Sequence, residues 1–136
     1  MLTASLSELP RVARELARFL AGDYVIFLQG DLAAGKTTLV KALANVKGVK
    51  GPVTSPTFSI QQIYGEGFYH YDLYQCPTQK FFALGLAEAF ESPGWHLVEW
   101  GEEDLRRWAR DNGFATALIQ IIPAQEGREY RVEKDA

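Results

Sequence analysis

The sequence contains a single cysteine, Cys76, so the chain cannot form an internal disulfide bond. Proteins of a reducing compartment commonly have few disulfides, and we therefore expect a cytoplasmic protein. The sequence also lacks any run of about 18 apolar residues, which is the length that a membrane-spanning helix needs. We therefore expect no contact with a membrane.

A surplus of basic residues is also missing. The chain has 14 Lys and Arg residues against 17 Asp and Glu residues, which gives a formal net charge of −3 at pH 7. A protein that binds nucleic acid by itself usually presents a basic surface. Two small groups of basic residues, within 41–50 and 106–110, are more simply explained as solvated helix faces. Any contact with RNA is therefore expected to be shared with a partner.

Internal repeats, low-complexity stretches and linkers are absent as well. The chain has 136 residues, of which 47% are hydrophobic, and we expect a single domain over 1–136. The sequence pattern predicts helices at 9–20, 36–47, 79–90 and 105–110. It predicts strands at 24–29, 57–64, 68–73, 95–100, 116–122 and 129–132. This order of elements predicts an α/β fold, in which helices flank a mixed sheet.

Three local patterns refine this expectation. Ser7 is the expected N-cap of the first helix, because it leaves Pro10 in the first turn, where the missing N–H costs nothing. The continuous apolar run YVIFLQ, at 24–29, is typical of a strand buried on both faces in a parallel sheet. Residues 65–67, Gly-Glu-Gly, separate two predicted strands and indicate an antiparallel hairpin.

Residues 30–38 read GDLAAGKTT and lie between a predicted buried strand and a predicted helix. They match G-x-x-x-x-G-K-[ST], the pattern of a phosphate-binding P-loop. Glycine lets such a loop curl, so that its N–H groups and the positive end of the following helix face a phosphate. The predicted nucleotide-binding residues are Asp31, Leu32, Ala33, Ala34, Gly35, Lys36, Thr37 and Thr38. A purely structural glycine-rich turn is the alternative.

Two side chains of this loop have specific expected roles. Lys36 can reach the β- and γ-phosphates of a nucleotide, and the Thr37 hydroxyl can bind Mg²⁺. The motif and its strand–helix context therefore predict a P-loop NTPase-like three-layer fold that binds a nucleoside triphosphate with Mg²⁺.

A P-loop enzyme that hydrolyses its nucleotide also needs a carboxylate near the metal and an oriented water molecule. Asp72 and Glu99 each interrupt or end an apolar strand-like run, where an unpaired charge is costly to bury. Both are candidate catalytic residues, and Glu99 is a candidate metal ligand beside Thr37. A carboxylate at a solvated strand end is the alternative for each. Trp100 is expected either to stack on a nucleotide ring or simply to pack.

Two further features carry weaker signals. The segment TSPTF, at 54–58, is either a loop that senses the γ-phosphate or an ordinary turn. His70 lies two residues before Asp72, so the two side chains are expected on the same face of a strand. His96 lies in another strand-like run, and no further Cys or His lies at a spacing typical of zinc sites.

The motifs GDLAAGKTT, TSPTF, HYDLYQ and VEWGE occur along the chain in this order. Together, over about residues 5–132, they resemble the TsaE (YjeE) family. Its members are small bacterial P-loop ATPases needed to make threonylcarbamoyladenosine, the modified adenosine beside the anticodon in tRNAs that read codons beginning with A.

The resemblance implies cofactors, site residues and partners. ATP and Mg²⁺ would be the cofactors, with Thr37 and Glu99 on the metal and with Lys36, Asp72 and Glu99 in the catalytic site. The family's tryptophan falls on Trp100, its switch-like loop on 55–57 and its base-binding segment near 4–6. The implied partner is the TsaB–TsaD heterodimer, in which TsaD carries the transfer chemistry and through which tRNA is reached indirectly.

The chain departs from the family pattern at two positions. The family loop usually reads GDLGAGKTT, whereas this chain has Ala33 in place of a glycine. If that position requires a positive φ, alanine costs on the order of 1 kcal/mol there. Gln75 replaces an arginine of the family motif, which removes a cation that could contact a partner or phosphate.

Other functions remain open at this stage. A small-molecule or nucleotide kinase also uses a P-loop, although no arginine-rich lid segment follows the P-loop helix. A nucleotide-dependent binding module without hydrolysis is compatible with Ala33. A GTPase is disfavoured, because the sequence has no Asn-Lys-x-Asp motif to recognise guanine.

Overall fold

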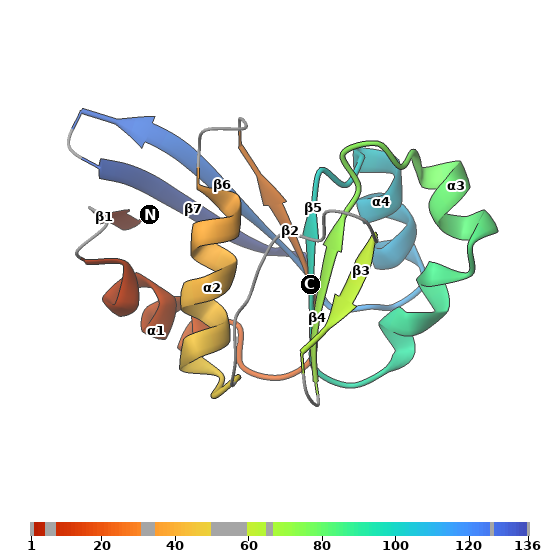
Figure 1. Ribbon diagram of the computed structural model, residues 1–136, viewed down its shortest axis with the longest axis horizontal. Coiled ribbons are helices and arrows are strands. Elements are labelled where there is room, and N and C mark those ends of the chain that lie inside the picture. Colours follow the sequence, from red (N-terminus) through yellow and green to blue (C-terminus); the bar gives the residue numbers. More distant parts are fainter. Residues whose placement is uncertain are drawn as a thin grey trace.

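A mixed seven-stranded sheet runs through the centre of the computed structural model (Figure 1). The structure describes residues 2–4, 8–30, 35–49, 60–64, 67–125 and 127–135. The strands are β1 (Leu2–Ala4), β2 (Tyr24–Gln29), β3 (Gln61–Ile63), β4 (Phe68–Asp72), β5 (Trp95–Glu99), β6 (Thr116–Ala124) and β7 (Gly127–Asp135). Their order across the sheet is β1-β7-β6-β2-β5-β4-β3.

The middle of the sheet is parallel and its two edges are antiparallel. Strand β2 pairs in parallel with both β5 and β6, and β4 pairs in parallel with β5. Strands β3, β7 and β1 are added antiparallel to β4, β6 and β7 respectively. Because parallel strands end at the same edge of a sheet, the carboxyl ends of β2, β4 and β5 lie side by side. Ligands commonly bind at this edge in α/β proteins.

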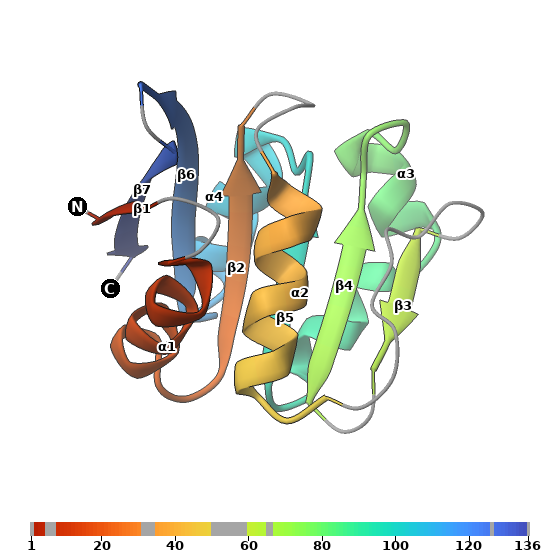
Figure 2. The same cartoon turned by 60° about the vertical axis from the view of Figure 1, so that its left-hand side comes forward.

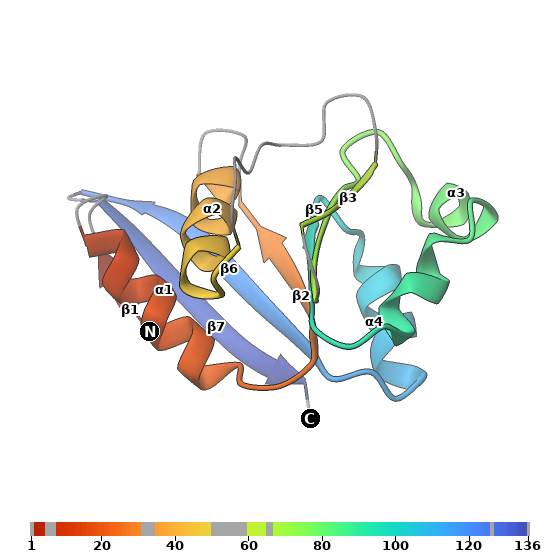
Figure 3. The same cartoon turned by 60° about the horizontal axis from the view of Figure 1, so that its bottom comes forward.

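Helices cover both faces of the sheet and make three layers. Figure 2 shows α1 (Leu9–Phe19) and α2 (Lys36–Val46) in front of the strands. Figure 3 shows them on one side of the sheet, with α3 (Thr78–Ala83) and α4 (Glu103–Asp111) on the other. The short 3₁₀ helix η3 (Leu86–Glu91) follows α3 on that second side. The predicted α/β three-layer fold with a mixed sheet is therefore confirmed.

Each face of the sheet carries its own apolar core. Leu16, Leu39 and Leu43 of α1 and α2 pack on one face with Leu28 of β2. Phe81, Phe90 and Leu105 pack on the other face with Phe27 of β2. Alternate residues of β2 enter opposite cores, which is why its sequence is continuously apolar rather than alternating.

Several element boundaries differ from the prediction. The predicted helix over 79–90 is two pieces, because Gly85 takes a left-handed φ of 74° between α3 and η3. The last two strands are longer than predicted and form the β6–β7 hairpin. Strand β1 was not predicted, and the strand predicted at 57–64 is β3, with 57–59 outside the described residues.

Two further boundaries shift by a residue or two. The N-cap of α1 is Glu8, and the predicted cap Ser7 lies outside the described residues. Pro10 does occupy the first turn, as expected. Helix α4 begins at Glu103 rather than at 105, with two acidic residues in its first turn that favour the positive end of the helix dipole.

Two glycines outside the candidate site allow a matched test of the fold. Gly94 has a φ of 119°, and a Cβ placed on it would lie 2.3–2.6 Å from backbone atoms of Gly67. Gly22 has a φ of 106° but no heavy atom within 4 Å of such a Cβ. Gly94→Ala should therefore lower the free energy of unfolding by about 2–5 kcal/mol, through backbone strain and steric overlap.

Gly22→Ala is the control, because it introduces the strain without the overlap. It should cost only about 1–2 kcal/mol. Urea unfolding of the two variants measures the difference, and equal losses of stability would show that the approach of Gly94 to Gly67 is not a constraint on the fold.

Among the described residues, no helix is both long enough and apolar enough to cross a lipid bilayer.

Candidate functional site

The end of β2 and the start of α2 form the described ends of the predicted phosphate loop. Gly35 is the N-cap of α2 and has a left-handed backbone, with φ 94° and ψ 31°. Residues other than glycine rarely adopt this conformation, which explains the second glycine of the motif. Residues 31–34, and with them four of the predicted nucleotide-binding residues, lie outside the described residues. Thr38 is exposed in the first turn of α2.

The Lys36 side chain reaches back from the start of α2 to the end of β2. Only 4% of Lys36 is exposed, although a lysine is rarely buried without partners. Its Nζ donates a hydrogen bond to the Gly30 carbonyl at 2.5 Å and lies 3.8 Å from the centroid of the Trp100 ring. The ammonium group therefore lies between the two ends of the loop, where a phosphate in the loop would meet it.

The Glu99 carboxylate lies beside the same helix end. Glu99 is the last residue of β5 and is only 3% exposed. Both of its carboxylate oxygens lie 3.4 Å from the Thr37 hydroxyl oxygen. The structure thus brings the two predicted metal ligands together from α2 and β5.

His70 is a site residue that the sequence did not reveal. Its ring lies fully buried, and its Nε2 is 2.5 Å from Glu99 Oε2. Since a carboxylate oxygen can only accept, Nε2 carries the hydrogen and donates it to Glu99. His70 Nδ1 has no hydrogen-bond partner among the described residues. The parallel pairing of β4 with β5 creates this contact, and only a correct strand register could have predicted it.

Asp72 lies at the same sheet edge but in a different environment. Its Cα is the register partner of Glu99 across β4 and β5. Its Oδ1 accepts a hydrogen bond from the backbone N–H of Tyr74 at 3.1 Å, in the turn that follows β4. The side chain is partly exposed, so the edge holds one buried and one partly exposed carboxylate. His70 and Asp72 point to the same side of β4 by strand alternation.

Strand β5 ends at Glu99, one residue earlier than predicted, and Trp100 follows it outside the strand. Trp100 has a φ of 63°, which is unusual for a residue with a side chain. Its ring contacts Lys36 Nζ and meets the Tyr74 ring edge-on, with centroids 5.1 Å apart. The next residue is Gly101, where a Cβ would lie 2.9 Å from the side chains of Phe27 and Val98. The close packing therefore favours glycine at this position.

A cleft of about 220 Å³ opens beside this turn. Its lining includes Gln29, Gly30, Trp100, Glu103 and Arg106. It therefore joins the first end of the candidate phosphate loop to the start of α4. Trp100 forms part of the wall of this cleft, and the Lys36 ammonium group contacts the Trp100 ring.

The oxygens of Thr37 and Glu99 suit a magnesium ion. Mg²⁺ binds oxygen ligands at about 2.0–2.1 Å in an octahedron, which places adjacent ligands about 3 Å apart. The observed separation of 3.4 Å is close to this value. No group of three or more His, Cys, Asp or Glu residues in the described part of the chain could hold a metal. A divalent ion here would therefore share these two oxygens with ligand or water oxygens.

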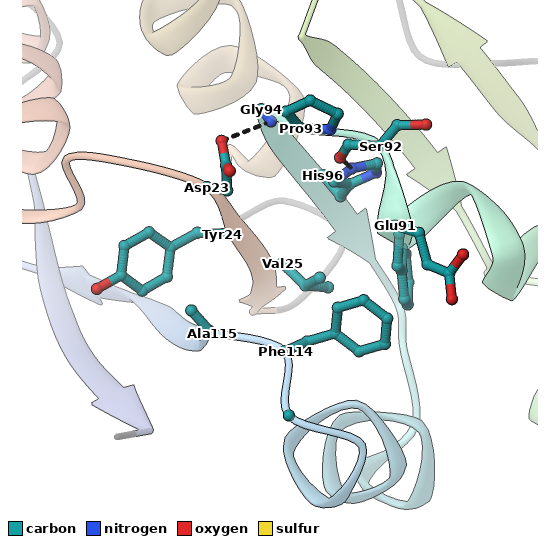
Figure 4. Close-up of a pocket in the computed structure, with 12 residues that line it drawn as sticks. Asp23, Tyr24, Val25, Glu91, Ser92, Pro93, Gly94, His96, Phe114 and Ala115 are labelled. Carbon is teal, nitrogen blue, oxygen red and sulfur yellow. Dashed lines mark hydrogen bonds between the residues drawn. The ribbon is translucent and has the colours of Figure 1, made fainter.

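A second hollow, of about 370 Å³, lies at the opposite end of β2 and β5 (Figure 4). Asp23 in its wall accepts a hydrogen bond from the Gly94 N–H at 2.8 Å. His96 Nε2 donates to the Ser92 carbonyl at 2.8 Å, and Tyr71 Oη donates to His96 Nδ1 at 2.7 Å. These polar groups form hydrogen bonds within the protein that connect neighbouring segments of the fold. None of the predicted site residues lines this hollow.

Burial of His96 gives the protein a defined pH dependence. Desolvation lowers the pKa of His96 below its ordinary value of 6.5, although the Ser92 carbonyl and Asp23 oppose the shift. The unfolded chain therefore takes up this proton first as the pH falls. The stabilising contribution of neutral His96 is complete above about pH 6.5 and is lost as the pH drops below that value.

We expect the free energy of unfolding of the protein to fall between pH 7.5 and 5.5 more steeply than that of His96→Gln. Glutamine removes the titrating ring but keeps one donor and one acceptor. Urea unfolding at both pH values measures the two slopes. Equal slopes would mean that His96 does not titrate differently in the folded and unfolded chains.

The sequence of this chain is similar to one family of known proteins. The family model described as "Threonylcarbamoyl adenosine biosynthesis protein TsaE" matches residues 3–130. A relative from Bacillus subtilis is 40% identical over 101 residues, which are 72% of this chain and 63% of that protein. A relative from Nostoc sp. is 40% identical over 94 residues, 64% of this chain and 58% of that protein.

A third relative, from Aquifex aeolicus, is 41% identical over 99 residues, 69% of this chain and 70% of that protein. All three relatives are named tRNA threonylcarbamoyladenosine biosynthesis protein TsaE. The chain thus matches less than two thirds of the length of the Nostoc and Bacillus relatives. Among solved structures, Bacillus YdiB aligns with a TM-score of 0.67 at 29% identity, over 97% of this chain and 81% of that one.

Proposed function

The chain belongs to the TsaE family, and from this premise we propose that it binds and hydrolyses ATP with Mg²⁺ to support threonylcarbamoyladenosine modification of tRNA. One observation carries the proposal. Glu99, which lies 62 residues after Thr37 along the chain, comes together with Lys36 and Thr37 where β2 and β5 end and α2 begins. A cation, a hydroxyl and a carboxylate beside a helix N-terminus are the groups that a Mg-nucleotide requires.

In this proposal each side chain has one task. The Lys36 ammonium and the N–H groups at the start of α2 bind the phosphates and stabilise negative charge as it develops. Thr37 and Glu99 would hold the metal ion, which would supply positive charge to neutralise the bound phosphates. His70 donates to one Glu99 oxygen and thereby fixes the direction in which the carboxylate points.

Asp72 is proposed to orient the attacking water molecule. It lies beside Glu99 at the sheet edge and is more exposed, so water can reach it. Trp100 is proposed to border the nucleotide, because its ring forms a wall of the cleft and contacts Lys36. The segment at 54–58, proposed as a switch, lies outside the described residues.

The proposed partner is a TsaB–TsaD heterodimer in the cytoplasm, which would bring the protein to tRNA. The net charge of −3 supports an indirect contact, because an acidic protein has little attraction for a polyanion by itself. Tyr74, 56% exposed, presents an aromatic ring next to Trp100 and offers an apolar contact close to the nucleotide site.

Reconstitution tests the proposed function. The protein is mixed with TsaB, TsaD, their small-molecule substrates and tRNA, with γ-labelled ATP and Mg²⁺. We expect release of labelled phosphate to water and several rounds of tRNA modification per complex, both of which require this chain. Omitting the chain is the control and should stop modification after about one round.

Two other outcomes would favour the alternative functions. Transfer of the label to a small acceptor instead of water would identify a kinase. Tight ATP binding with no phosphate release in the full mixture would identify a binding module that does not hydrolyse ATP.

A further inference from the structure

The His70 ring has one fixed position in the sheet. Strand β4 lies between β3 and β5 (Figure 1), and His70 pairs with Gln62 on one side and with Leu97 on the other. Its side chain has no exposed surface, and the centroid of the Tyr64 ring lies 6.4 Å from that of His70. Side chains packed this closely keep a single rotamer. The ring nitrogen Nε2 is therefore held where it donates to Glu99 Oε2.

Packing alone does not explain a histidine at this position. A buried polar atom without a hydrogen bond destabilises the fold, and His70 Nδ1 has no partner among the described residues. The other buried histidine, His96, has hydrogen bonds at both ring nitrogens. An apolar side chain of similar size would fill the position of His70 without this penalty. The contact with Glu99 is therefore what a histidine contributes here.

The hydrogen bond from His70 makes the two oxygens of the Glu99 carboxylate unequal. Oε2 accepts the Nε2–H of His70 at 2.5 Å. The Thr37 hydroxyl oxygen lies 3.4 Å from each carboxylate oxygen, so Thr37 does not distinguish them. An oxygen that already accepts a hydrogen bond from a close donor has less electron density to give to a metal ion. A metal ion beside Thr37 would therefore use Oε1 as its single ligand from Glu99.

A carboxylate that offers one oxygen favours Mg²⁺ over Ca²⁺. Mg²⁺ is small and requires a nearly regular octahedron, and the two oxygens of one carboxylate are too close together to fill two of its corners. Ca²⁺ is larger, takes about six to eight oxygen ligands and can bind both oxygens of one carboxylate. A hydrogen bond that occupies Oε2 of Glu99 therefore removes a ligand from Ca²⁺ and none from Mg²⁺.

We propose that His70 is a positioning residue that selects Mg²⁺ over Ca²⁺ by keeping Oε2 of Glu99 away from the metal ion. This inference rests on the proposed Mg-ATP function and adds to it the choice of metal. His70 acts through Glu99 and does not itself bind the ion. Replacing His70 therefore leaves the proposed metal ligands in place, and its effect is measured as a difference between the two metals.

Calorimetry with a non-hydrolysable ATP analogue tests this role without turnover. The analogue is titrated with saturating Mg²⁺, with saturating Ca²⁺ and with no divalent ion. The unaltered protein should bind the analogue more tightly with Mg²⁺ than with Ca²⁺. In His70→Met, which has no donor, the affinity with Mg²⁺ should fall by about 10- to 100-fold. The affinity with Ca²⁺ should fall less, because Ca²⁺ can then bind both Glu99 oxygens, and the affinity without a metal ion should not change.

Two substitutions serve as matched controls. His70→Gln places an amide nitrogen near the position of Nε2, so it keeps the donor and should keep the preference for Mg²⁺. His96→Met makes the same change at a buried histidine on β5 that bonds to Ser92 and Tyr71 instead. It should leave the metal preference unchanged, whatever its effect on the stability of the fold. Circular dichroism and urea unfolding establish that each variant is folded.

The remaining outcomes separate this inference from the proposed function. Equal affinities with Mg²⁺ and Ca²⁺ in the unaltered protein would overturn the inference, and this comparison needs no variant. An unchanged preference in folded His70→Met, or an equal loss with both metals, would also overturn it and leave the proposed function intact. If the unaltered protein binds the analogue in none of the three conditions, the proposed function fails and this inference fails with it. Should His70→Met not fold, His70→Leu is judged by the same criteria.

Discussion

Lys36→Ala should reduce the affinity for Mg-ATP by about 100-fold or more, because more than one charge-assisted hydrogen bond to phosphate is lost. The Lys36 side chain is buried, and its Nζ lies between the Gly30 carbonyl and the Trp100 ring. Alanine would leave the phosphates facing this position without a cation. Calorimetric titration with Mg-ATP measures the loss directly.

Lys41→Ala is the control for this change. Lys41 lies on the same helix but is exposed to solvent, so its removal alters the net charge equally without touching the loop. We expect it to bind Mg-ATP as the unaltered protein does. If Lys36→Ala also bound normally, the loop would be a structural turn and the nucleotide site would lie elsewhere.

Glu99→Ala should lower ATP turnover by about 100-fold or more, the scale of effect typical of losing a catalytic acid–base or metal-holding group. Binding of ATP should weaken far less, because Lys36 and the helix N-terminus remain. Glu99 belongs to β5 and not to the phosphate loop, and its carboxylate contacts the Thr37 hydroxyl. Its removal should therefore affect the metal ion more than the phosphates. Phosphate release in the presence of TsaB and TsaD, together with calorimetry, separates the two effects.

Glu99→Gln refines this test, because it keeps the size of the side chain and removes its charge. It should lose turnover as Glu99→Ala does. Glu133→Gln, at a side chain that is 63% exposed on β7, is the matched control and should retain turnover. Parental turnover in Glu99→Ala would contradict the assignment of Glu99 to the metal.

Asp72→Asn should also lose turnover while keeping its affinity for ATP. The asparagine oxygen can still accept the hydrogen bond from the Tyr74 N–H, so the turn after β4 is preserved and only the charge is removed. Unchanged turnover would assign Asp72 to that turn alone.

The parts of this site that the sequence predicts are those encoded locally. A buried strand and a helix were predicted at 24–29 and 36–47 on either side of a glycine-rich loop, and the structure has the strand and the helix at nearly these boundaries. Glu99 was also identifiable, because a carboxylate at the end of an apolar run requires an explanation. The α/β fold followed from the same local patterns.

The parts that the sequence does not predict depend on contacts between distant segments. The hydrogen bond of His70 to Glu99 depends on the parallel pairing of β4 with β5. The approach of Arg128 to Gly35 depends on the β6–β7 hairpin lying next to the start of α2. Strand β5 ends early because Trp100 has a positive φ. Nothing in the sequence indicated this, because tryptophan usually favours strands.

The central claim is that the structure at Gly35, Lys36, Thr37 and Glu99 binds the triphosphate of ATP. Isothermal titration of the purified protein with ATP in the presence of Mg²⁺ tests it most directly, with Lys36→Ala titrated in parallel. We predict saturable heat at one nucleotide per chain for the protein and none for the variant. The absence of any binding heat for the protein, alone and mixed with TsaB and TsaD, would contradict the claim.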